Sequence, residues 1–525
     1  MSGPYVLGID YGTQSCRVGI FDLTGHAVGL AATEYATSHP RPGWAEQNPL
    51  DWWLAVQSST RQALAQSKVD PSDIIAIAQD ATTTTVVAAD ANGEPLRPAI
   101  MWMDVRATEQ ADRANSIQAG TPAHNARLYN GGGTAPASPE FYPFKVAWLK
   151  DNEPEIFQRA AYLVDATDWV THRLTGQWTV NINSAAQRMY HNRDYGGWPV
   201  EFYQHIGVGE IFSKVPERVL DLGQPVGGLT QEAADALGLK AGTPVAQGPC
   251  DAWAGQIGLG VVRPGKMVLI TGSSHVISGQ SAVPVYGPGF FGSFTDSVVP
   301  GQYTVEGGQV STGSVMKWFR DNFARDVYSV AERTGLSVYD LLGQEAANIP
   351  VGSDGLIVNE YFQGNRTPYT DGKARGIVWG LSLAHGAAHV YHAIQEGICY
   401  GTAHILRSMK AAGFEPSEIV ICGGMTKSVP LMQMHADITG LPIVLNEVTD
   451  AVVLGSSMCA AVGAGAYPDL LAAADAMVRQ VDTLAPDMSR NQEYQFYIDQ
   501  YIAAYPALRP QIHQVVDHEA AKTQA

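Results

Sequence analysis

The first apolar positions of the chain form two short runs that a polar turn separates. Residues 5–9 and 18–21 are rich in apolar, β-branched and aromatic side chains, which predicts two strands. The stretch between them, Asp10-Tyr11-Gly12-Thr13-Gln14-Ser15, has the composition of a tight turn. A second turn at Thr24-Gly25 leads into a third strand. The N-terminus therefore predicts consecutive strands, the first of which ends on a carboxylate.

A related pattern occurs twice more in the second half of the chain. Residues 266–270 predict a strand that runs into Thr271-Gly272-Ser273-Ser274. Residues 419–422 predict a strand that meets Gly423-Gly424 and then a helix that ends at Gly440. Backbone N–H groups at such turns, and the positive end of a helix, favour bound phosphate. A single Gly-Gly turn is more often only a tight connection, but the three turns together indicate phosphates held between two similar halves.

The pattern also predicts one long helix, over residues 387–412. Its apolar positions recur at spacings of three and four, which places them on one helix face. These positions are Val390, Ile394, Ile398, Gly401 and Ile405. Gly413 follows directly and is suited to end the helix. We therefore expect this helix to bury one face in the second half of the protein.

Length and charge narrow the classes of function. A chain of 525 residues is too long for one compact core, which predicts two large domains or several small ones. With 33 Lys+Arg against 51 Asp+Glu the formal net charge is −18, which disfavours nucleic acid and anionic lipid as partners. The five cysteines form no C-x-x-C pair, so neither a disulfide framework nor a zinc site is indicated. No leader pattern and no uncharged apolar run of about 18 residues is found, and we expect a cytoplasmic protein.

The side chains of the first turn suit a bound nucleotide phosphate. Gly12 lets the backbone approach a ligand, and Thr13 and Ser15 offer donors. Arg17 adds a positive charge to the same stretch. Asp10 would repel phosphate unless a magnesium ion, or water bound to one, lies between them. The alternative is a plain hairpin whose aspartate accepts hydrogen bonds from the turn.

Asp251 is a candidate general base. It follows a strand-like run over residues 243–246 and Gly248-Pro249, and it precedes an apolar helical segment. Transfer of a phosphoryl group to a hydroxyl requires a group that accepts the hydroxyl proton and orients its oxygen. A carboxylate with no neighbouring counter-charge in the sequence is suited to this task. The alternative is a helix N-cap, a position that aspartate often occupies, and one carboxylate can serve both purposes.

Six motifs, in order along residues 5 to about 465, together resemble the FGGY family of carbohydrate kinases. They are GIDYGTQSCRVGIFD at 8–22, GWAEQNPLDWW at 43–53, IMWMDVRA at 100–107, GPCDAWAG at 248–255, GLSLAHGAAHVYHAIQEGICYGT at 380–402 and ICGGMTKSVPLMQMHADITGLPI at 421–443. The resemblance implies an α/β fold of two duplicated actin-like (ribonuclease H-like) ATPase domains with an interdomain cleft. It also implies that ATP and Mg²⁺ are the cofactors.

Within this family the chain most resembles ribulokinase-like members. The similarity lies in VEGGQVSTGS at 305–314 and GNRTPYTD at 364–371. Two positions depart from the family pattern. Tyr142 stands three residues before Lys145, where a small residue is usual, and Arg188 stands where ribulokinases tend to have lysine, as glycerol kinases do. The second departure weakens the assignment to ribulose but not the assignment to a kinase.

A sugar site needs planar polar groups for paired hydrogen bonds and an aromatic wall. The resemblance implies sugar-contacting roles for Asp80, Thr82, Trp102, Asp104, Arg106, Arg188 and Glu306. Several of them have other interpretations: Trp102 as a core residue, Asp104 with Arg106 as a surface pair, and Glu306 as a carboxylate at a strand end. Asp80 and Glu306 are the stronger candidates, because an acid after an apolar strand is otherwise costly to bury.

The remaining roles divide between nucleotide and metal. ATP is expected at Gly12, Thr13, Gln14, Ser15, Arg17, Thr271, Gly272, Ser273, Gly313, Gly423 and Gly424. Among these, Gly423 and Gly424 would face the adenosine. Asp10 would organise the magnesium ion and Asp251 would accept the proton, with a further role for Asp251 in the water shell of the metal.

The predicted domains are residues 1–258, with the sugar site and the first phosphate loop, and 259–485, which binds the nucleotide. Residues 486–525 form a closing helical segment. The predicted activity is ATP-dependent phosphorylation of a primary hydroxyl of a small ketose, above all a pentulose such as ribulose. Alternatives are a xylulokinase or a glycerol, erythritol or ribitol kinase, or an actin-like ATPase that acts on a protein partner. The partners expected are the sugar and ATP, with neither nucleic acid nor membrane, and the resemblance implies a homodimer.

Overall fold

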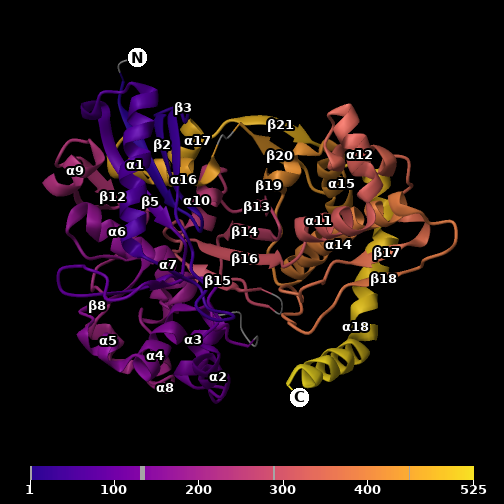
Figure 1. The fold of residues 1–525 in the computed structure, drawn as a ribbon, viewed down its shortest axis with the longest axis horizontal. Helices are drawn as coiled ribbons and strands as arrows, with labels where there is room; N and C mark the ends of the chain where they lie inside the picture. The colour runs from indigo at the N-terminus through magenta and orange to yellow at the C-terminus, as the bar shows by residue number, and fades with distance from the viewer. Residues whose placement is uncertain (1–2, 131–135, 288–289, 448–449, 525) are drawn as a thin grey trace.

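The computed structural model of the protein describes residues 3–130, 136–287, 290–447 and 450–524. The chain forms two halves, each built around a mixed sheet (Figure 1). The first sheet has the strand order β11-β12-β5-β1-β2-β3. Its strands are β1 Tyr5–Tyr11, β2 Ser15–Asp22, β3 Ala27–Glu34, β5 Ile74–Ala81, β11 Pro225–Gly228 and β12 Pro244–Ala246.

The second sheet repeats the central pattern of the first. Its order is β15-β16-β14-β13-β19-β20-β21. Strand β13 pairs antiparallel with β14 and parallel with β19, as β1 pairs antiparallel with β2 and parallel with β5. The strands are β13 Lys266–Thr271, β14 His275–Ser281, β15 Gly292–Thr295, β16 Tyr303–Gln309, β19 Glu418–Gly423, β20 Ile443–Asn446 and β21 Gln480–Leu484.

Short strands and helices complete the two halves. A small sheet joins β4 Glu46–Gln47, β7 Ala99–Ile100, β6 Val86–Ala89 and β8 Tyr162–Asp165, and two strand pairs join β9 Val180–Asn181 to β10 Val219–Leu220 and β17 Ile357–Asn359 to β18 Ile377–Trp379. The helices before the second sheet are α1 Pro49–Ser67, α2 Thr108–Asn115, α3 Pro122–Asn130, α4 Tyr142–Asn152, α5 Pro154–Arg159, α6 Ala166–Thr175, α7 Ile182–Arg188, α8 Val200–His205, α9 Gln231–Leu237 and α10 Asp251–Gly258. Those that follow are α11 Gly313–Phe323, α12 Arg325–Thr334, α13 Val338–Ala346, α14 Ala387–Ala411, α15 Val429–Thr439, α16 Ala451–Gly463, α17 Leu470–Met477 and α18 Met488–Gln524.

Strand β1 extends further than the sequence predicts. All seven of its residues are buried, because Leu7 and Ile9 face the core that contains α1 whereas Val6 faces the core that contains α16. The strand continues through Asp10, which lies opposite Arg17 in the register with β2. This pairing of opposite charges allows a carboxylate inside the strand. The turn between the strands is therefore shorter than predicted.

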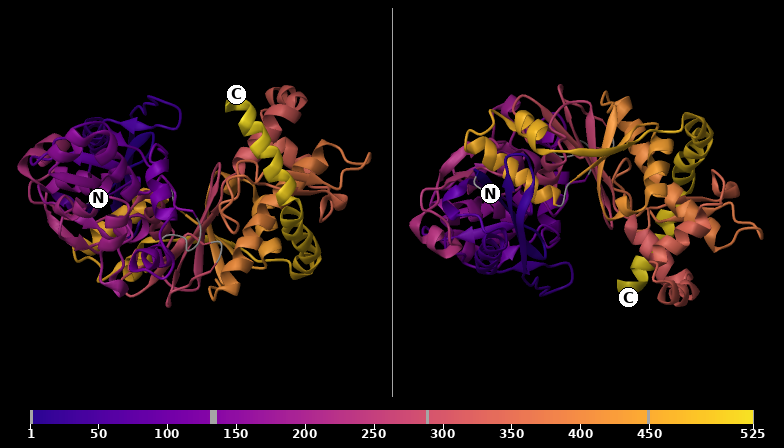
Figure 2. Two further views of the ribbon diagram at one scale, coloured as in Figure 1. Left: turned by 90° about the horizontal axis from the view of Figure 1, so that it is seen from below. Right: turned by 90° about the horizontal axis from the view of Figure 1, so that it is seen from above.

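Helices α16 and α17 show that the chain returns to the first half after it has built most of the second sheet. Although α16 follows β20 in sequence, it packs on β1 and β5 (Figure 1). Views from above and below show the same crossing of the C-terminal chain into the first half (Figure 2). The predicted domain limits at residues 258 and 485 assign α16 and α17 to the second domain. In space, both helices lie with the first sheet.

Helices α10 and α16 cross with their backbones in close approach. A Cβ atom built on Gly455 would lie 1.9 Å from the carbonyl oxygen of Ala254, and one on Gly258 would lie 1.9 Å from that of Ala451. No side chain fits at such a distance unless the helices separate. Glycine at both positions therefore sets the spacing of the two helices.

Gly455→Ala is expected to destabilise the protein by about 1–3 kcal/mol, because overpacking outweighs the gain in helix propensity. Gly343→Ala is the matched control, since Gly343 lies within helix α13 and a Cβ there meets no atom within 4 Å. This control should stabilise the protein by up to about 1 kcal/mol. Thermal unfolding of both variants gives the answer, and equal increases in melting temperature would contradict the tight crossing.

The predicted long helix forms as α14 but is more buried than expected. Residues 391–406 are all buried, because α15, α18 and β17 pack around the helix. Gly413 adopts a positive φ of 99°, as a residue that follows a helix end often does. Helix α18 contributes three fully buried tyrosines, Tyr494, Tyr501 and Tyr505, to the core of this half. No helix in the described part of the chain is long and apolar enough to cross a membrane.

Candidate functional site

Two buried aspartates lie side by side where β1 and β5 end. Asp10 and Asp80 are partners in the parallel register of these strands, and both are fully buried. The Oδ2 atom of Asp10 accepts a hydrogen bond from Arg17 Nε at 2.6 Å, and Oδ2 of Asp80 accepts one from Ser456 Oγ at 2.5 Å. Neither Oδ1 atom accepts a hydrogen bond from the described residues. Burial raises the pKa of both groups, and the Asp10 charge raises that of Asp80 further.

Asp251 completes an acidic group with these two residues. It is the first residue of α10, whose N-cap is Cys250, so the alternative of an N-capping Asp251 is wrong. Its Oδ1 atom accepts a hydrogen bond from the N–H of Ala252 at 2.7 Å, and the residue is partly exposed. Burial and the neighbouring Asp10 charge raise the pKa of Asp251 to about 7. A carboxyl group with this pKa can accept a proton near neutral pH.

Asp10 offers a ligand for a single magnesium ion, although the three aspartates do not together form a protein cage for one. Buried carboxylate oxygens without donors, such as Oδ1 of Asp10, are suitable ligands for a hard cation. The described residues contain no group of three or more His, Cys, Asp or Glu side chains that could hold a metal ion. Magnesium usually takes one or two carboxylates and completes its shell with water and substrate phosphates. Asp10 is therefore suited to the metal role predicted for it.

The first glycine turn is held in shape by hydrogen bonds from its own residues and from Tyr35, the residue that follows β3. The N–H of Gly12 donates to the carbonyl oxygen of Ser15 at 3.0 Å, and the Tyr35 hydroxyl donates to the carbonyl oxygen of Gly12 at 2.5 Å. Thr13 and Ser15 are partly exposed and Gln14 is exposed. The turn thus presents polar groups to a ligand on a fixed backbone.

The positive charge of Arg17 is paired with carboxylates of the fold and is not free at this turn. Its guanidinium group forms ion pairs with Asp10 and with Asp450, whose Oδ2 atom lies 2.7 Å from Nη1. Asp450 is the N-cap of α16. Arg17 therefore links the acidic group to the helix that returns from the second half, and its predicted contact with phosphate remains a prediction.

The second and third glycine turns contact each other at the ends of β13 and β19. Thr271 Oγ1 donates to the carbonyl oxygen of Cys422 at 2.7 Å. The N–H of Gly313, the first residue of α11, donates to the carbonyl oxygen of Gly272 at 3.2 Å. Gly423 has a φ of 100°, and a Cβ atom on it would lie 1.9 Å from the carbonyl oxygen of Thr271. A Cβ atom on Gly424 meets no atom within 4 Å. The two turns form one continuous backbone surface that is open at Gly424.

Ser273 belongs to this surface as well. Its carbonyl oxygen accepts hydrogen bonds from the N–H of Thr312 at 3.0 Å and from Ser314 Oγ at 3.0 Å. The start of α11 is thereby fixed to the turn after β13. The structure thus brings together the residues of the second half that are predicted to bind ATP.

Arg188 and Glu306 connect the two halves of the protein. Arg188, the last residue of α7, donates from Nη2 to both carboxylate oxygens of Glu306 on β16, at 2.7 and 2.8 Å. The side chains retain only 10% exposure each. The rings of Phe141, Trp253, Phe291 and Phe294 surround the guanidinium group. The pair provides polar groups and an aromatic wall at one place, as a sugar site requires.

Asp104 and Arg106 are buried, so the alternative of a surface pair is wrong. Arg106 donates from Nε and Nη2 to the carboxylate of Asp104, and its Nη1 atom lies 2.8 Å from Glu46 Oε1. Its guanidinium carbon lies 3.8 Å from the ring centroid of Trp44. The hydrogen bonds of these side chains are thus largely used within the fold. Their predicted role in sugar binding stays a prediction.

Trp102 and Thr82 lie closer to the phosphate turn and to the acidic group. Trp102 retains 36% exposure, which excludes the alternative of a core residue, and its Nε1 donates to Thr13 Oγ1 at 3.0 Å. Thr82 is buried, with its hydroxyl 2.7 Å from that of Thr85 and its N–H bonded to Tyr11. Glu306 lies within β16, so the alternative of a carboxylate at a strand end is wrong. The seven predicted sugar residues therefore form separate groups near the end of β5, after β7, and around the middle of β16.

Three contacts of the site were not predicted from the sequence. Ser456 bonds Asp80, Asp450 bonds Arg17, and Lys145 lies beneath Trp102 with three hydrogen bonds to backbone carbonyls. Asp450 precedes an apolar helical run, and this N-cap pattern is a local signal that was available. Ser456 has no such signal, because its partner is 376 residues away in the sequence.

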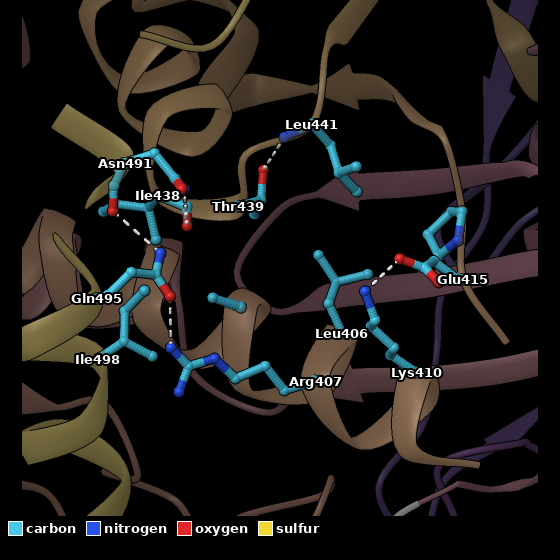
Figure 3. Close-up of a pocket in the computed structure, with 12 residues that line it drawn as sticks. Leu406, Arg407, Lys410, Glu415, Ile438, Thr439, Leu441, Asn491, Gln495 and Ile498 are labelled. Atoms are coloured by element: carbon cyan, nitrogen blue, oxygen red, sulfur yellow. Dashed lines mark hydrogen bonds and ion pairs between the residues drawn. The ribbon is translucent and has the colours of Figure 1, made fainter. Parts of the chain in front are cut away.

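A pocket of about 240 Å³ lies elsewhere, among α14, α15 and α18 (Figure 3). None of the predicted site residues lines it. Its two cations are already paired: Arg407 donates to Gln495 and Asp499, and Lys410 pairs with Glu415 (Figure 3). This pocket is therefore separate from the candidate site.

Comparisons with known proteins agree with this arrangement. Residues 5–258 match the N-terminal domain, and residues 267–464 the C-terminal domain, of the FGGY family of carbohydrate kinases. The chain is 32% identical to an FGGY carbohydrate kinase domain-containing protein of Xenopus laevis over 95% of both chains, and 31% identical to a ribulokinase of Shouchella clausii over 95% of this chain and 94% of that one. A solved structure of a xylulose kinase from Rhodospirillum rubrum is 27% identical, with a TM-score of 0.84 over 97% of this chain and all of that one.

Proposed function

The chain belongs to the FGGY family of carbohydrate kinases, and we propose on this premise that it transfers the terminal phosphoryl group of ATP to a primary hydroxyl of a small ketose, a pentulose such as ribulose. That the chain is a sugar kinase, with the predicted α/β fold of two actin-like ATPase domains, is confirmed by the family and by its structural neighbours. The identity of the sugar, the magnesium ion and the residue roles belong to the proposal.

One observation carries the mechanism: Asp251 combines a raised pKa of about 7 with a place beside Asp10 at the start of α10. In the proposed reaction Asp251 accepts the proton of the sugar hydroxyl and orients its oxygen. Asp10 would hold the magnesium ion, which neutralises phosphate charge when it is bound. The turns at Gly12–Ser15 and at Thr271–Ser273 would contact the phosphates, and Gly423 with Gly424 would face the adenosine.

The choice of a pentulose rests on the named relatives. Several curated relatives at 31–32% identity are ribulokinases, whereas the neighbouring solved structure at 27% identity is a xylulose kinase. Arg188, which stands where ribulokinases tend to have lysine, reaches Glu306 rather than solvent. Because these curated relatives are ribulokinases, ribulose is the first candidate. Xylulose, ribitol, glycerol and erythritol are the alternatives.

An actin-like ATPase that acts on a protein partner would need the phosphate turns but no Arg188–Glu306 pair within an aromatic wall. The presence of that pair favours a sugar as the acceptor. The expected cytoplasmic location and homodimer stay predictions.

The test is ADP release by the purified protein with ATP and magnesium, against D- and L-ribulose, D- and L-xylulose, ribitol, glycerol, erythritol and no sugar. We expect one pentulose to stimulate release well above the control without sugar, and L- or D-ribulose to be that compound. Stimulation by xylulose or by a polyol alone would replace the proposed substrate. Equal release in every well would refute sugar phosphorylation of this panel and favour a protein partner.

A further inference from the structure

Lys145 is a fully buried lysine whose hydrogen bonds all go to backbone carbonyls. It lies on α4, and its Nζ atom donates to the carbonyl oxygens of Thr84 at 2.9 Å, Met101 at 2.7 Å and Trp102 at 3.0 Å. An ammonium group has three donors, so its capacity is filled. None of the ion pairs among the described residues includes Lys145.

Burial of such a group is costly unless the fold uses it. A buried charge without a carboxylate partner costs several kcal/mol, and burial lowers the pKa of Lys145 to about 7. An apolar side chain of the same length would fill the space without this penalty. The three carbonyl groups belong to two separate backbone segments, and their hydrogen bonds to one ammonium group therefore point to a role in holding the backbone.

The backbone that Lys145 holds is strained. Thr84 has a φ of 57°, a left-handed conformation that a β-branched residue rarely adopts. Its carbonyl oxygen accepts from Lys145, and its N–H donates to Asp165 Oδ2 at 2.7 Å. Asp165 is itself fixed as the N-cap of α6 and by Ser184 Oγ at 2.8 Å. Thr84 is thus held at both ends by buried charged groups.

The same lysine joins two segments that carry candidate acceptor residues. Thr84 follows β5, which bears Asp80, and lies within the turn that contains Thr82. Trp102 follows β7 and donates its indole N–H to Thr13 in the first phosphate turn. A shift of the segment after β7 would move the partly exposed Trp102 ring relative to that turn. Lys145 therefore connects the turn after β5, the segment after β7 and the phosphate turn.

We propose that Lys145 is a positioning residue for the sugar subsite, which fixes the strained turn at Thr84 and the backbone of Trp102 in the arrangement that receives the acceptor. This inference rests on the proposed function, since it assigns these segments to the sugar. Lys145 does not contact the reacting atoms. Its main effect is on the affinity for the acceptor, because its hydrogen bonds reach the segments after β5 and β7 and not the turns of the second half that are proposed to bind ATP.

The test compares Lys145→Met with Lys150→Met in steady-state kinetics. Lys150 lies on the same helix but is partly exposed and pairs with Glu210, so its replacement controls for loss of a lysine from α4. Lys145→Met should raise the KM for the sugar tenfold or more and leave the KM for ATP within twofold. Lys150→Met should change neither constant by more than twofold. An unchanged sugar KM in Lys145→Met, with only a smaller active fraction, would overturn the proposal.

A second variant separates positioning from general damage to the fold. Glycine adopts the conformation of Thr84 without strain, so Thr84→Gly reduces the need for a clamp. Added to Lys145→Met, it should restore at least part of the lost sugar affinity. A double variant no better than Lys145→Met would show that the clamp on Thr84 is not the cause.

Hydrogen–deuterium exchange tests this inference independently of the proposed function. If no sugar stimulates the unchanged protein, the proposed function fails before any variant is made. Peptides that cover residues 82–85 and 101–106 should still exchange faster in Lys145→Met, whereas peptides of residues 271–274 should not. Unchanged exchange in the first two segments would refute the positioning of the backbone by Lys145, whatever the activity.

Discussion

Asp251→Asn is expected to bind ATP as the unchanged protein does and to lose turnover by a factor on the order of 10²–10⁴. Asparagine keeps an oxygen that can accept the hydrogen bond from the N–H of Ala252, so α10 should start as before. What it loses is the ability to accept a proton from the sugar hydroxyl. The measurements are ADP release with the best sugar of the panel and binding of a fluorescent ATP analogue.

Asp112→Asn is the matched control, because it makes the same chemical change on the exposed face of α2. It should leave turnover within twofold. Normal turnover in Asp251→Asn would remove this residue from the mechanism, and loss of ATP binding in the same variant would show that it supports the nucleotide instead.

The pH dependence adds a second readout for the same residue. A base must be deprotonated to act, and the pKa of Asp251 is raised to about 7 by burial and by Asp10. The value of kcat/KM for the sugar should therefore fall about tenfold per pH unit below that pKa and level off above it. Asp251→Asn should lack this dependence. A flat profile in the unchanged protein from pH 5 to 8 would contradict the assignment.

Local signals in the sequence predicted the elements around the site. Glycine turns, apolar runs and helix-ending glycines depend on neighbours within a few residues, so the strands near Gly12, Gly272 and Gly423 could be placed. The exact end of a strand could not be placed in the same way. Asp10 lies inside β1 because Arg17 is its partner in the register, and a sequence pattern does not show that register.

Contacts between residues that are distant in the sequence could not be predicted, for a different reason. Arg106 pairs with Asp104 and with Glu46 in the interior, and its predicted contact with a sugar stays a prediction. Asp80, whose predicted contact with the sugar stays a prediction, lies beside Asp10 and accepts a hydrogen bond from Ser456, which is 376 residues away in the sequence. Tertiary packing determines such partners. The type and spacing of residues within one stretch of the sequence do not indicate them.

The family resemblance supplied what local signals could not. It predicted a fold of two actin-like ATPase domains and a sugar kinase, both of which are confirmed. It did not predict that α16 would return to the first sheet and bring Asp450 to Arg17. This return matters because it links the acidic group directly to a segment that follows the second half in sequence.

Arg188→Met is expected to raise the sugar KM tenfold or more and to destabilise the protein by about 3–5 kcal/mol. The replacement keeps an apolar stem among the four aromatic rings but leaves the carboxylate of Glu306 buried without its partner. Arg188→Lys should lie between the unchanged protein and Arg188→Met, because a lysine keeps the charge opposite Glu306 but lacks both the planar group that faces the rings and the second nitrogen that donates to the Gln187 carbonyl oxygen. Sugar kinetics and thermal unfolding measure both effects.

The exposed pair of Arg263 and Asp475 is the matched control for this prediction. It also joins a guanidinium group to both oxygens of one carboxylate, through Nη1 at 2.8 Å and Nη2 at 2.7 Å, but its side chains are 38% and 66% exposed. Arg263→Met should therefore cost no more than about 1 kcal/mol and leave the sugar KM unchanged. Equal losses of stability in the two arginine variants would show that burial of the pair is not what makes it important.

A double-mutant cycle with Glu306→Gln then tests whether Arg188 and Glu306 act as a unit. Each single change leaves one buried polar group without its partner, whereas the double change removes both charges together. Arg188→Met with Glu306→Gln should be less destabilised than the sum of the single changes by about 0.5–3 kcal/mol. Additive effects would mean that the two residues serve the site independently. A shared loss, together with weaker sugar binding in each variant, would identify the pair as the contact through which both halves hold the acceptor.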